Sequence, residues 1–196
     1  MLHDLDATLA ALLAAELSLP NVSVSFEGPD DQFPPSSVAL PAISLFLYDI
    51  RENLDLRTSE WELTQGPDGA TTRRRAPARA DCSYLITAWA STSAPDPAAD
   101  EHRLLGEVMA VLLRHRTVPD TYLQGVLAGQ EPPVRTRIMS DGRLQSIGEF
   151  WQAMGGRPKA TLHYGVTVSV DVFAPTAVGP KVTDHVITIT REPASN

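Results

Sequence analysis

Residues 161–173 read TLHYGVTVSVDVF, and this stretch decides the fold class. Its apolar side chains, from Leu162 to Val172, alternate one by one with the small or polar side chains from Thr161 to Asp171. A period of two residues is typical of a β-strand with one face in the core and the other in water, which is common in antiparallel sheets. A strand of this length would span roughly 43 Å at about 3.3 Å per residue. We therefore expect it to bend at Gly165 or to project beyond the core.

Shorter stretches with related patterns predict the other strands. Residues 22–26 alternate strictly, residues 42–50 are mostly apolar, and residues 80–91 form another extended run. The GPDG sequence at residues 66–69 is a turn signal between two extended stretches. The first of these stretches is 59–64, and the chain returns through 73–77. Further strands are expected at 134–139 and 184–190, and loops at 27–41 and 176–182.

Helical periodicity separates these strands. Leucines at three- and four-residue steps predict a helix over 4–19, and a broad apolar stripe from Leu104 to Leu113 predicts one over 100–116, with Asp100 as its N-cap. Ser146 and Glu149 have the spacing of a capping box, which predicts a further helix that ends at Gly155. A short helical turn is expected at 121–127.

The interleaving of these elements predicts the architecture. Because strands and helices do not follow a regular βαβ period, we expect an α+β fold, with a mostly antiparallel sheet and helices packed on one face. We expect residues 1–173 to form this domain, and residues 174–196 to form a C-terminal extension made of a loop and a terminal strand.

Composition excludes several classes of function. The chain has 16 basic and 24 acidic residues, a net charge of −8, which argues against a general binder of nucleic acid or anionic membranes. The presence of a single cysteine, Cys82, excludes an intramolecular disulfide framework. We expect Cys82 to be a small core residue. The apolar run from Leu9 to Ala15 is too short to span a membrane, and Asp4 and Asp6 are acidic where a secretory signal would be basic. We expect a soluble, cytoplasmic protein.

No catalytic constellation is visible in the sequence. Phosphate loops, dinucleotide-binding glycine turns, zinc-protease motifs and nucleophile elbows are all absent, and no two histidines lie three to five residues apart. We therefore expect no cofactor and no metal. The alternative from another class is a small enzyme or ligand-binding module with a cleft near His102 or His163. The three tryptophans are predicted to be core anchors: Trp61, Trp89 and Trp151.

One basic cluster stands out, formed by Arg73, Arg74, Arg75 and Arg79. Nucleic-acid binding is disfavoured, because no aromatic residue is interleaved and the chain as a whole is acidic. Two interpretations stay open: a solvated hairpin tip, or a docking point for an acidic protein partner.

Four segments together carry a family resemblance: LFLYDIREN at 45–53, YLITAWA at 84–90, EHRLLG at 101–106 and YGVTV at 164–168. In order and spacing they resemble the tail-terminator or cap proteins of phage-tail-like contractile injection systems, the group that includes the antifeeding prophage. The resemblance covers roughly Leu2 to Phe173. Its signature residues are Tyr48, Asp49, Ile50, Glu52, Asn53, Trp89, Glu101, His102 and Leu105.

The resemblance implies a structural protein with a phage tail-terminator-like fold, and no catalytic residues to carry over. Such a protein forms a ring, expected to be hexameric, on the distal end of the inner tube and sheath and stops both from polymerising. The implied partners are further copies of the chain and the sheath and tube proteins. A baseplate or tube-completion component of the same particle is a further alternative.

Two interface hypotheses follow from the resemblance. The terminal strand, with His185, Val186, Ile187 and Ile189, either pairs with an open edge of a sheath subunit or completes the domain's own sheet. The four arginines of the basic cluster are expected to contact an acidic rim of tube or sheath.

Overall fold

The computed structural model describes residues 1–29, 34–35, 37–66, 70–139, 144 and 146–178. The chain forms two compact units. Among the described residues, the first contains those within Met1–Arg57 and Ala78–Val170, and the second contains those within Thr58–Pro77 and from Asp171 to Val178. The predicted domain boundary after residue 173 stays a prediction.

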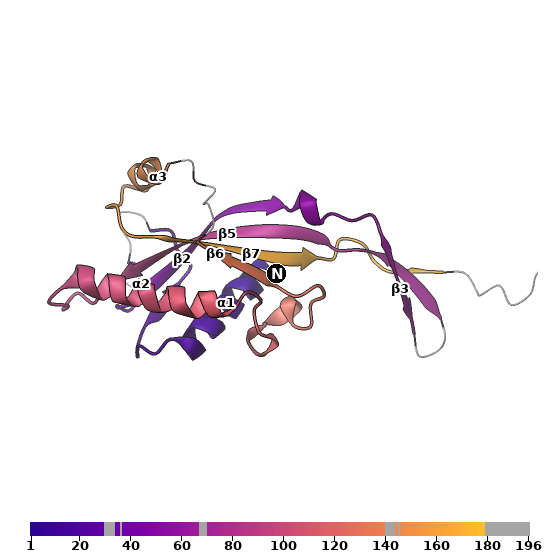
Figure 1. Ribbon diagram of the computed structural model, residues 1–196, viewed down its shortest axis with the longest axis horizontal. Helices are drawn as coiled ribbons and strands as arrows, with labels where there is room; N and C mark the ends of the chain where they lie inside the picture. Colours follow the sequence, from indigo (N-terminus) through magenta and orange to yellow (C-terminus); the bar gives the residue numbers. More distant parts are fainter. Residues whose placement is uncertain (30–33, 36, 67–69, 140–143, 145, 179–196) are drawn as a thin grey trace, which may run out of the picture. The chain divides into compact units, whose positions relative to one another are not determined.

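A five-stranded sheet forms the centre of the first unit, in the order β1-β2-β5-β7-β6. Strands β2, β5, β6 and β7 are labelled in Figure 1. Strand β1 (Ser23–Ser25) runs parallel to β2 (Ala42–Glu52). The other neighbours are antiparallel: β2 with β5 (Ala78–Trp89), β5 with β7 (Leu162–Val170), and β7 with β6 (Arg135–Ile138). The prediction of a mostly antiparallel sheet is therefore confirmed.

Helices lie over both faces of this sheet. Helices α1 (Leu2–Glu16) and α2 (Pro97–Arg114) cover one face, as predicted, whereas the short helix α3 (Ile147–Met154) lies over the other (Figure 1). There the ring of Phe150 lies 6.1 Å from that of Phe46 in β2, measured between centroids. The α+β class is therefore confirmed. The position of α3 differs from the expectation that all helices pack on one face, because β2 carries apolar side chains on both of its faces.

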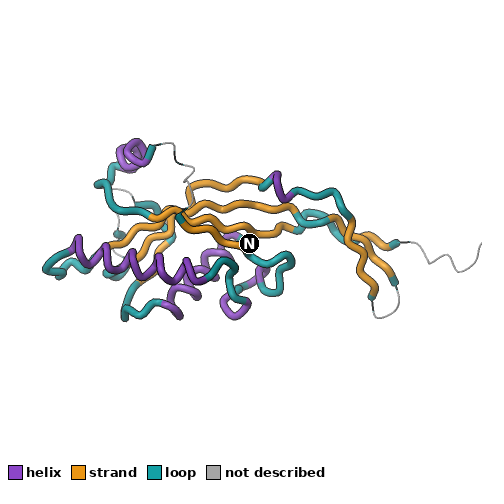
Figure 2. Tube along the Cα trace, in the orientation of Figure 1, coloured by secondary structure: helices purple, strands orange, loops and turns teal. Residues whose placement is uncertain are grey.

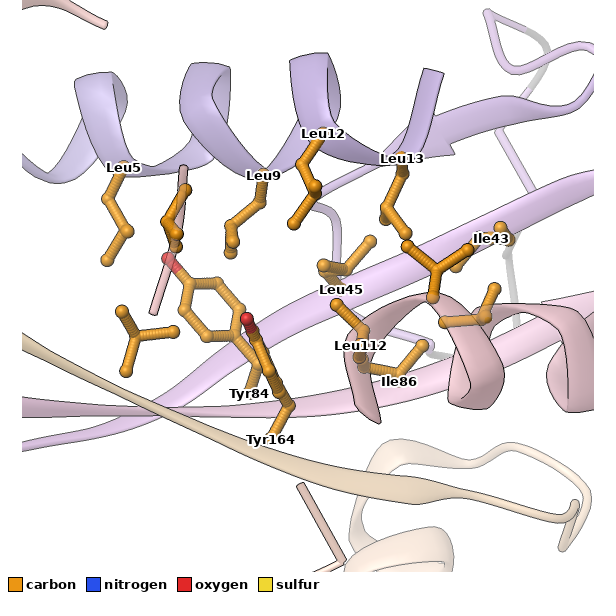
Figure 3. Close-up of a cluster of buried hydrophobic side chains, with 14 of the residues drawn as sticks. Leu5, Leu9, Leu12, Leu13, Ile43, Leu45, Tyr84, Ile86, Leu112 and Tyr164 are labelled. Carbon is orange, nitrogen blue, oxygen red and sulfur yellow. The ribbon is translucent and has the colours of Figure 1, made fainter. Parts of the chain in front are cut away.

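The main core lies between the sheet and helices α1 and α2. Figure 3 shows leucines of α1 pointing toward side chains of the sheet and of α2. The hydroxyl of Tyr84 donates a hydrogen bond to Asp6 Oδ1 at 2.8 Å, and burial raises the pKa of both groups. Cys82 is fully buried, as predicted, and burial raises the pKa of its thiol to about 11. The side chains labelled in Figure 3 are fully buried: Leu5, Leu9, Leu12, Leu13, Ile43, Leu45, Tyr84, Ile86, Leu112 and Tyr164.

The N-cap of helix α2 lies four residues earlier than the sequence pattern predicts. Its N-cap is Asp96, not Asp100, and Asp96 Oδ1 accepts a hydrogen bond from the backbone N–H of Ala99 at 3.2 Å. Pro97 then occupies the first turn, where a proline loses no intrahelical hydrogen bond. Pro95 and Pro97 therefore flank the N-cap and mark the start of the helix.

Strand β7 ends earlier than its alternating sequence pattern predicts. The two-residue period continues to Val172, yet the strand ends at Val170, which pairs with the first residue of β5, Ala78. Strand β5 offers no residue beyond this pair, so backbone pairing ends the strand before the side-chain pattern does. The predicted loop that follows contains the short strand β8 (Thr176–Ala177).

The described part of the second unit is a small sheet, in the order β3-β4-β8. Strands β3 (Trp61–Gln65) and β4 (Thr71–Arg75) form the predicted antiparallel hairpin, drawn in orange in Figure 2. Strand β8 pairs with β4 through Thr176 and Ala177. Every residue of β3 is exposed and no residue of β4 is buried, so the described strands of this hairpin form no buried core of their own. The predicted strand at 184–190 lies outside the described residues.

Candidate functional site

The first group of signature residues lies where β2 leaves the sheet. The hydroxyl of Tyr48 lies 3.3 Å from His163 Nδ1, and the two rings meet edge to face. The carboxylate of Asp49 pairs with Arg51 Nε at 2.9 Å. Strand β2 has an irregular register between Leu47 and Asp49, which shifts the pairing of the residues that follow.

His163 provides a test of pH-dependent stability. Burial lowers the pKa of its imidazole below the ordinary 6.5, so the unfolded chain binds the proton more readily than the folded chain. The stability that this group contributes is therefore present above pH 6.5 and is lost as pH falls through the folded pKa. We expect a lower urea midpoint at pH 5.5 than at pH 7.5, with a smaller difference in His163→Gln. Equal pH dependence in the two proteins would contradict this assignment.

Asn53 connects the end of β2 to the sheet. Its Oδ1 accepts from the backbone N–H of Leu56 at 3.1 Å and so caps the 3₁₀ helix η1 (Leu54–Leu56), while its Nδ2 donates to Asp81 Oδ2 at 3.0 Å. Glu52 lies 3.6 Å from Arg57 Nε, an exposed ion pair. Ile50 is 48% exposed. The segment from Ile50 to Leu56 is thus held in one conformation while its apolar side chains face solvent.

Asp81 is the centre of a polar network on the sheet face opposite the main core. Its oxygens accept hydrogen bonds from Thr167 Oγ1 at 2.6 Å, from Asn53 and from Arg137 Nη2 at 3.3 Å. Arg79 is only 6% exposed, and its Nε has no hydrogen-bond partner among the described residues. Burial lowers the pKa of Arg79, as does the positive charge of Arg135. The grouping of Arg79 with the basic cluster was therefore wrong, because its side chain is buried within the first unit.

The second group of signature residues surrounds a cavity of about 550 Å³ between the start of α2 and the loop before β7. Trp89, Glu101 and His102 line it together with Lys159. Lys159 Nζ lies 2.6 Å from Glu101 Oε1 and 3.8 Å from the centroid of the Trp89 ring. Of the two histidines named for the alternative cleft, His102 lines this cavity and His163 does not. Leu105 packs in the main core.

The hairpin of the second unit separates the other three arginines of the basic cluster. The guanidinium carbons of Arg73 and Arg75 lie 4.7 and 5.2 Å from the centroid of the Trp61 ring. Arg74 instead pairs with Glu62 at 3.0 Å and Asp171 at 3.1 Å, which raises the pKa of its guanidinium.

The arginine–tryptophan stack was not predicted from the sequence. Trp61 is 46% exposed, so its assignment to the core was wrong, whereas Trp151, at 2% exposed, is a core residue as expected. The interleaved aromatic residue that the cluster lacks in sequence is supplied from the facing strand. The two-residue spacing of Arg73 and Arg75 is the signal that could have indicated a shared face.

The described residues offer neither a metal-binding cluster nor a membrane-spanning helix. In this part of the chain no three histidine, cysteine, aspartate or glutamate side chains gather where they could hold a metal ion. None of the helices in the described segments combines the length and apolar character needed to cross a bilayer.

Residues 4–184 match the Pvc16 N-terminal domain family. The chain belongs to this family. Two solved structures are similar to this Pvc16 N-terminal domain. One is a sheath/tube terminator, in the extended state, of the extracellular contractile injection system PVC: identity is 25%, the TM-score is 0.70, and the match covers 100% of this chain and 65% of that one. The other is the tube-terminating cap of the anti-feeding prophage: identity is 28%, the TM-score is 0.69, and the match covers 96% of this chain and 62% of that one.

These matches confirm the resemblance predicted from the four sequence segments. The chain spans less than two thirds of the length of either similar protein. No curated protein matches the sequence. Both similar proteins are terminators or caps by name, and the first belongs to an extracellular contractile injection system.

Proposed function

We propose that the protein caps the distal end of a contractile injection particle and stops its inner tube and sheath from growing. The observation that carries this proposal is the similarity to two caps over 100% and 96% of the chain. Because the similarity covers both compact units, it supports a role for the whole described chain rather than for one shared core.

A cap must match a polymer end once and then offer no matching surface outward. Stacked rings grow by heterologous contacts, in which each layer presents to the next a copy of the surface that it used itself. We propose that the protein acts as a ring, hexameric by the resemblance, assembled onto the particle in the cytoplasm. Its partners would be further copies of the chain and the subunits of tube and sheath.

The proposed role is structural and not enzymatic. In support, the charged groups beside His102 already neutralise each other: Glu101 is paired with Lys159, whose ammonium group is also stacked on Trp89. This ion pair ties the loop before β7 to the start of α2. It thus fixes local structure, and it engages Glu101, the carboxylate among the described residues that line this cavity.

The terminal strand at 184–190 is proposed to pair with an open edge of a sheath subunit. It lies outside the described residues, and the proposal depends on its apolar sequence, with Val186, Ile187 and Ile189, and on its position after a loop. The alternative, that it completes the protein's own sheet, predicts loss of folding rather than loss of capping when it is removed.

Deletion of the gene followed by electron microscopy of purified particles tests the proposed function. We expect overlong or unstable sheath–tube assemblies, because nothing would then stop polymerisation. The full-length gene supplied in trans should restore normal particle length. If the terminal strand contacts the sheath, a gene for the chain truncated after Val178 should fail to restore it. Particles of normal length and stability would contradict the cap assignment. Loss of all sheath assembly would indicate a baseplate or tube-completion component instead.

A further inference from the structure

The β3–β4 hairpin has two faces of different chemistry. Because Trp61 pairs with Arg75 and Leu63 with Arg73, these four side chains project from one face, which we call the cationic face. Arg74 and Glu62, paired with each other in the register, project from the opposite face. There the charge of Arg74 is balanced by Glu62 and Asp171.

The cationic face has no such balance. Neither Arg73 nor Arg75 forms an ion pair with a carboxylate in the described part of the chain. Both guanidinium groups are stacked on Trp61, and Arg75 also lies 5.1 Å from the ring centroid of Phe173. Stacking holds the two charges in place, so less side-chain entropy is lost when a partner binds.

The same face carries a large exposed apolar surface. Leu63 is 69% exposed, and Phe173 is 51% exposed. A small sheet without a core is marginally stable in water, so covering this surface would stabilise the hairpin. The surface fits a partner that combines carboxylates with apolar side chains.

A segment of this chemistry is present in the first unit. Between Ile50 and Leu56 the chain exposes three apolar side chains, with Leu54 at 65% and Leu56 at 41%. Two carboxylates are exposed beside them: Asp55, which forms no ion pair among the described residues, and Glu52, which lies 3.6 Å from Arg57 in a weak exposed pair. The one basic residue of the segment, Arg51, is neutralised by Asp49 at 2.9 Å. We call it the acidic segment. Of the 13 large apolar side chains that are exposed among the described residues, eight lie in this segment or in the second unit. The first unit as a whole has 18 acidic and 11 basic residues, so a second copy presents an acidic body to the hairpin.

We propose that the cationic face of one copy docks on the acidic segment of a second copy. The two surfaces differ, so the contact is heterologous and repeats from copy to copy, which is the geometry that closes a ring. The proposal deepens the proposed function, since it depends on the ring and names the surfaces that form it. It also gives a role to the signature residues Ile50 and Glu52.

Charge reversal in the purified full-length chain tests the contact. Sedimentation velocity over a range of concentrations should detect self-association of the wild-type protein, weaker at high salt. In R73E/R75E the apparent dissociation constant should rise at least about tenfold, because carboxylates would face carboxylates. E52R/D55R should have an equal effect, because arginines would then face arginines.

Mixing the two variants gives the decisive measurement. In an equimolar mixture of R73E/R75E and E52R/D55R every contact between unlike copies pairs opposite charges, so association should return to near the wild-type level. The matched control is R103E/R114E, which changes the net charge equally on the exposed side of α2 and should leave association unchanged. Circular dichroism verifies that each variant is folded.

Three outcomes would overturn the proposal: a wild-type chain that stays monomeric at about 200 μM in low salt, a control that weakens association as much as R73E/R75E, or a mixture that stays monomeric. A monomeric chain whose R73E/R75E variant fails to cap particles would assign the cationic face to a tube or sheath subunit instead. Particle length after gene deletion is a separate measurement, so failure of this contact and failure of the proposed function are distinguishable.

Discussion

Replacing Leu112 by alanine is expected to lower the free energy of unfolding by about 2–5 kcal/mol, since it leaves a cavity in a close-packed interior. Leu112 is 2% exposed and belongs to the cluster of α1, α2 and sheet side chains that forms the main core. Removing its branched end deletes contacts with neighbours from different elements, which cannot all move to fill the space. Urea denaturation followed by circular dichroism measures the loss.

The next residue in the same helix is the matched control. Leu113 is 48% exposed, so Leu113→Ala should change the free energy of unfolding by less than about 0.5 kcal/mol. Both variants replace leucine by alanine one position apart in α2, so helix propensity changes equally. Similar losses in the two variants would mean that the orientation of α2 on the sheet is wrong.

Replacing Asp81 by alanine is expected to destabilise the protein by about 3 kcal/mol. The variant removes the hydrogen-bond acceptor of Thr167, Asn53 and Arg137. It also removes the carboxylate whose negative charge stabilises the buried Arg79 cation. A buried cation without a counter-charge is costly, because burial has stripped its water. Chemical denaturation at pH 7.5 gives the loss.

A second substitution separates the charge effect from the lost hydrogen bonds. Arg79→Met keeps most of the side-chain volume and removes the buried charge, so D81A/R79M should be more stable than D81A. As a control, Asp49→Ala breaks only the surface pair with Arg51 and should cost less than about 1 kcal/mol. If D81A/R79M is as unstable as D81A, the hydrogen bonds alone explain the effect.

Regular patterns located the elements of the first unit, and pairing decided where those elements end. The apolar stripe from Leu104 to Leu113 correctly predicted the position of α2. Leu113 nevertheless faces solvent while its neighbour Leu112 is buried, because successive residues in a helix point about 100° apart. The alternation that located β7 continues past Val170, where no strand of the sheet is left to pair with it. Ser146 and Gly155 bound α3 as predicted, because a cap is a local interaction and needs no tertiary contact.

The candidate site is formed by contacts between residues whose positions in the sequence do not indicate that they are neighbours. Arg79 lies four positions from Arg75, yet it is buried in β5, whereas Trp61, far from the cluster in sequence, lies under Arg73 and Arg75. Strand register determines both facts. Of the signature residues, Trp89, Glu101 and His102 meet at one cavity, which no spacing in the sequence could have indicated.

The strand order of the large sheet has a consequence for synthesis of the chain. The central strand β5 pairs on one side with β2, where Tyr84 meets Leu47, and on the other with β7, where it meets Tyr164, 80 positions later. While a ribosome makes the intervening segment, the nascent β5 has one edge open to other chains. Pairs so distant in sequence close slowly, so we expect a slow last step in which β7 joins a preformed β1-β2-β5 template.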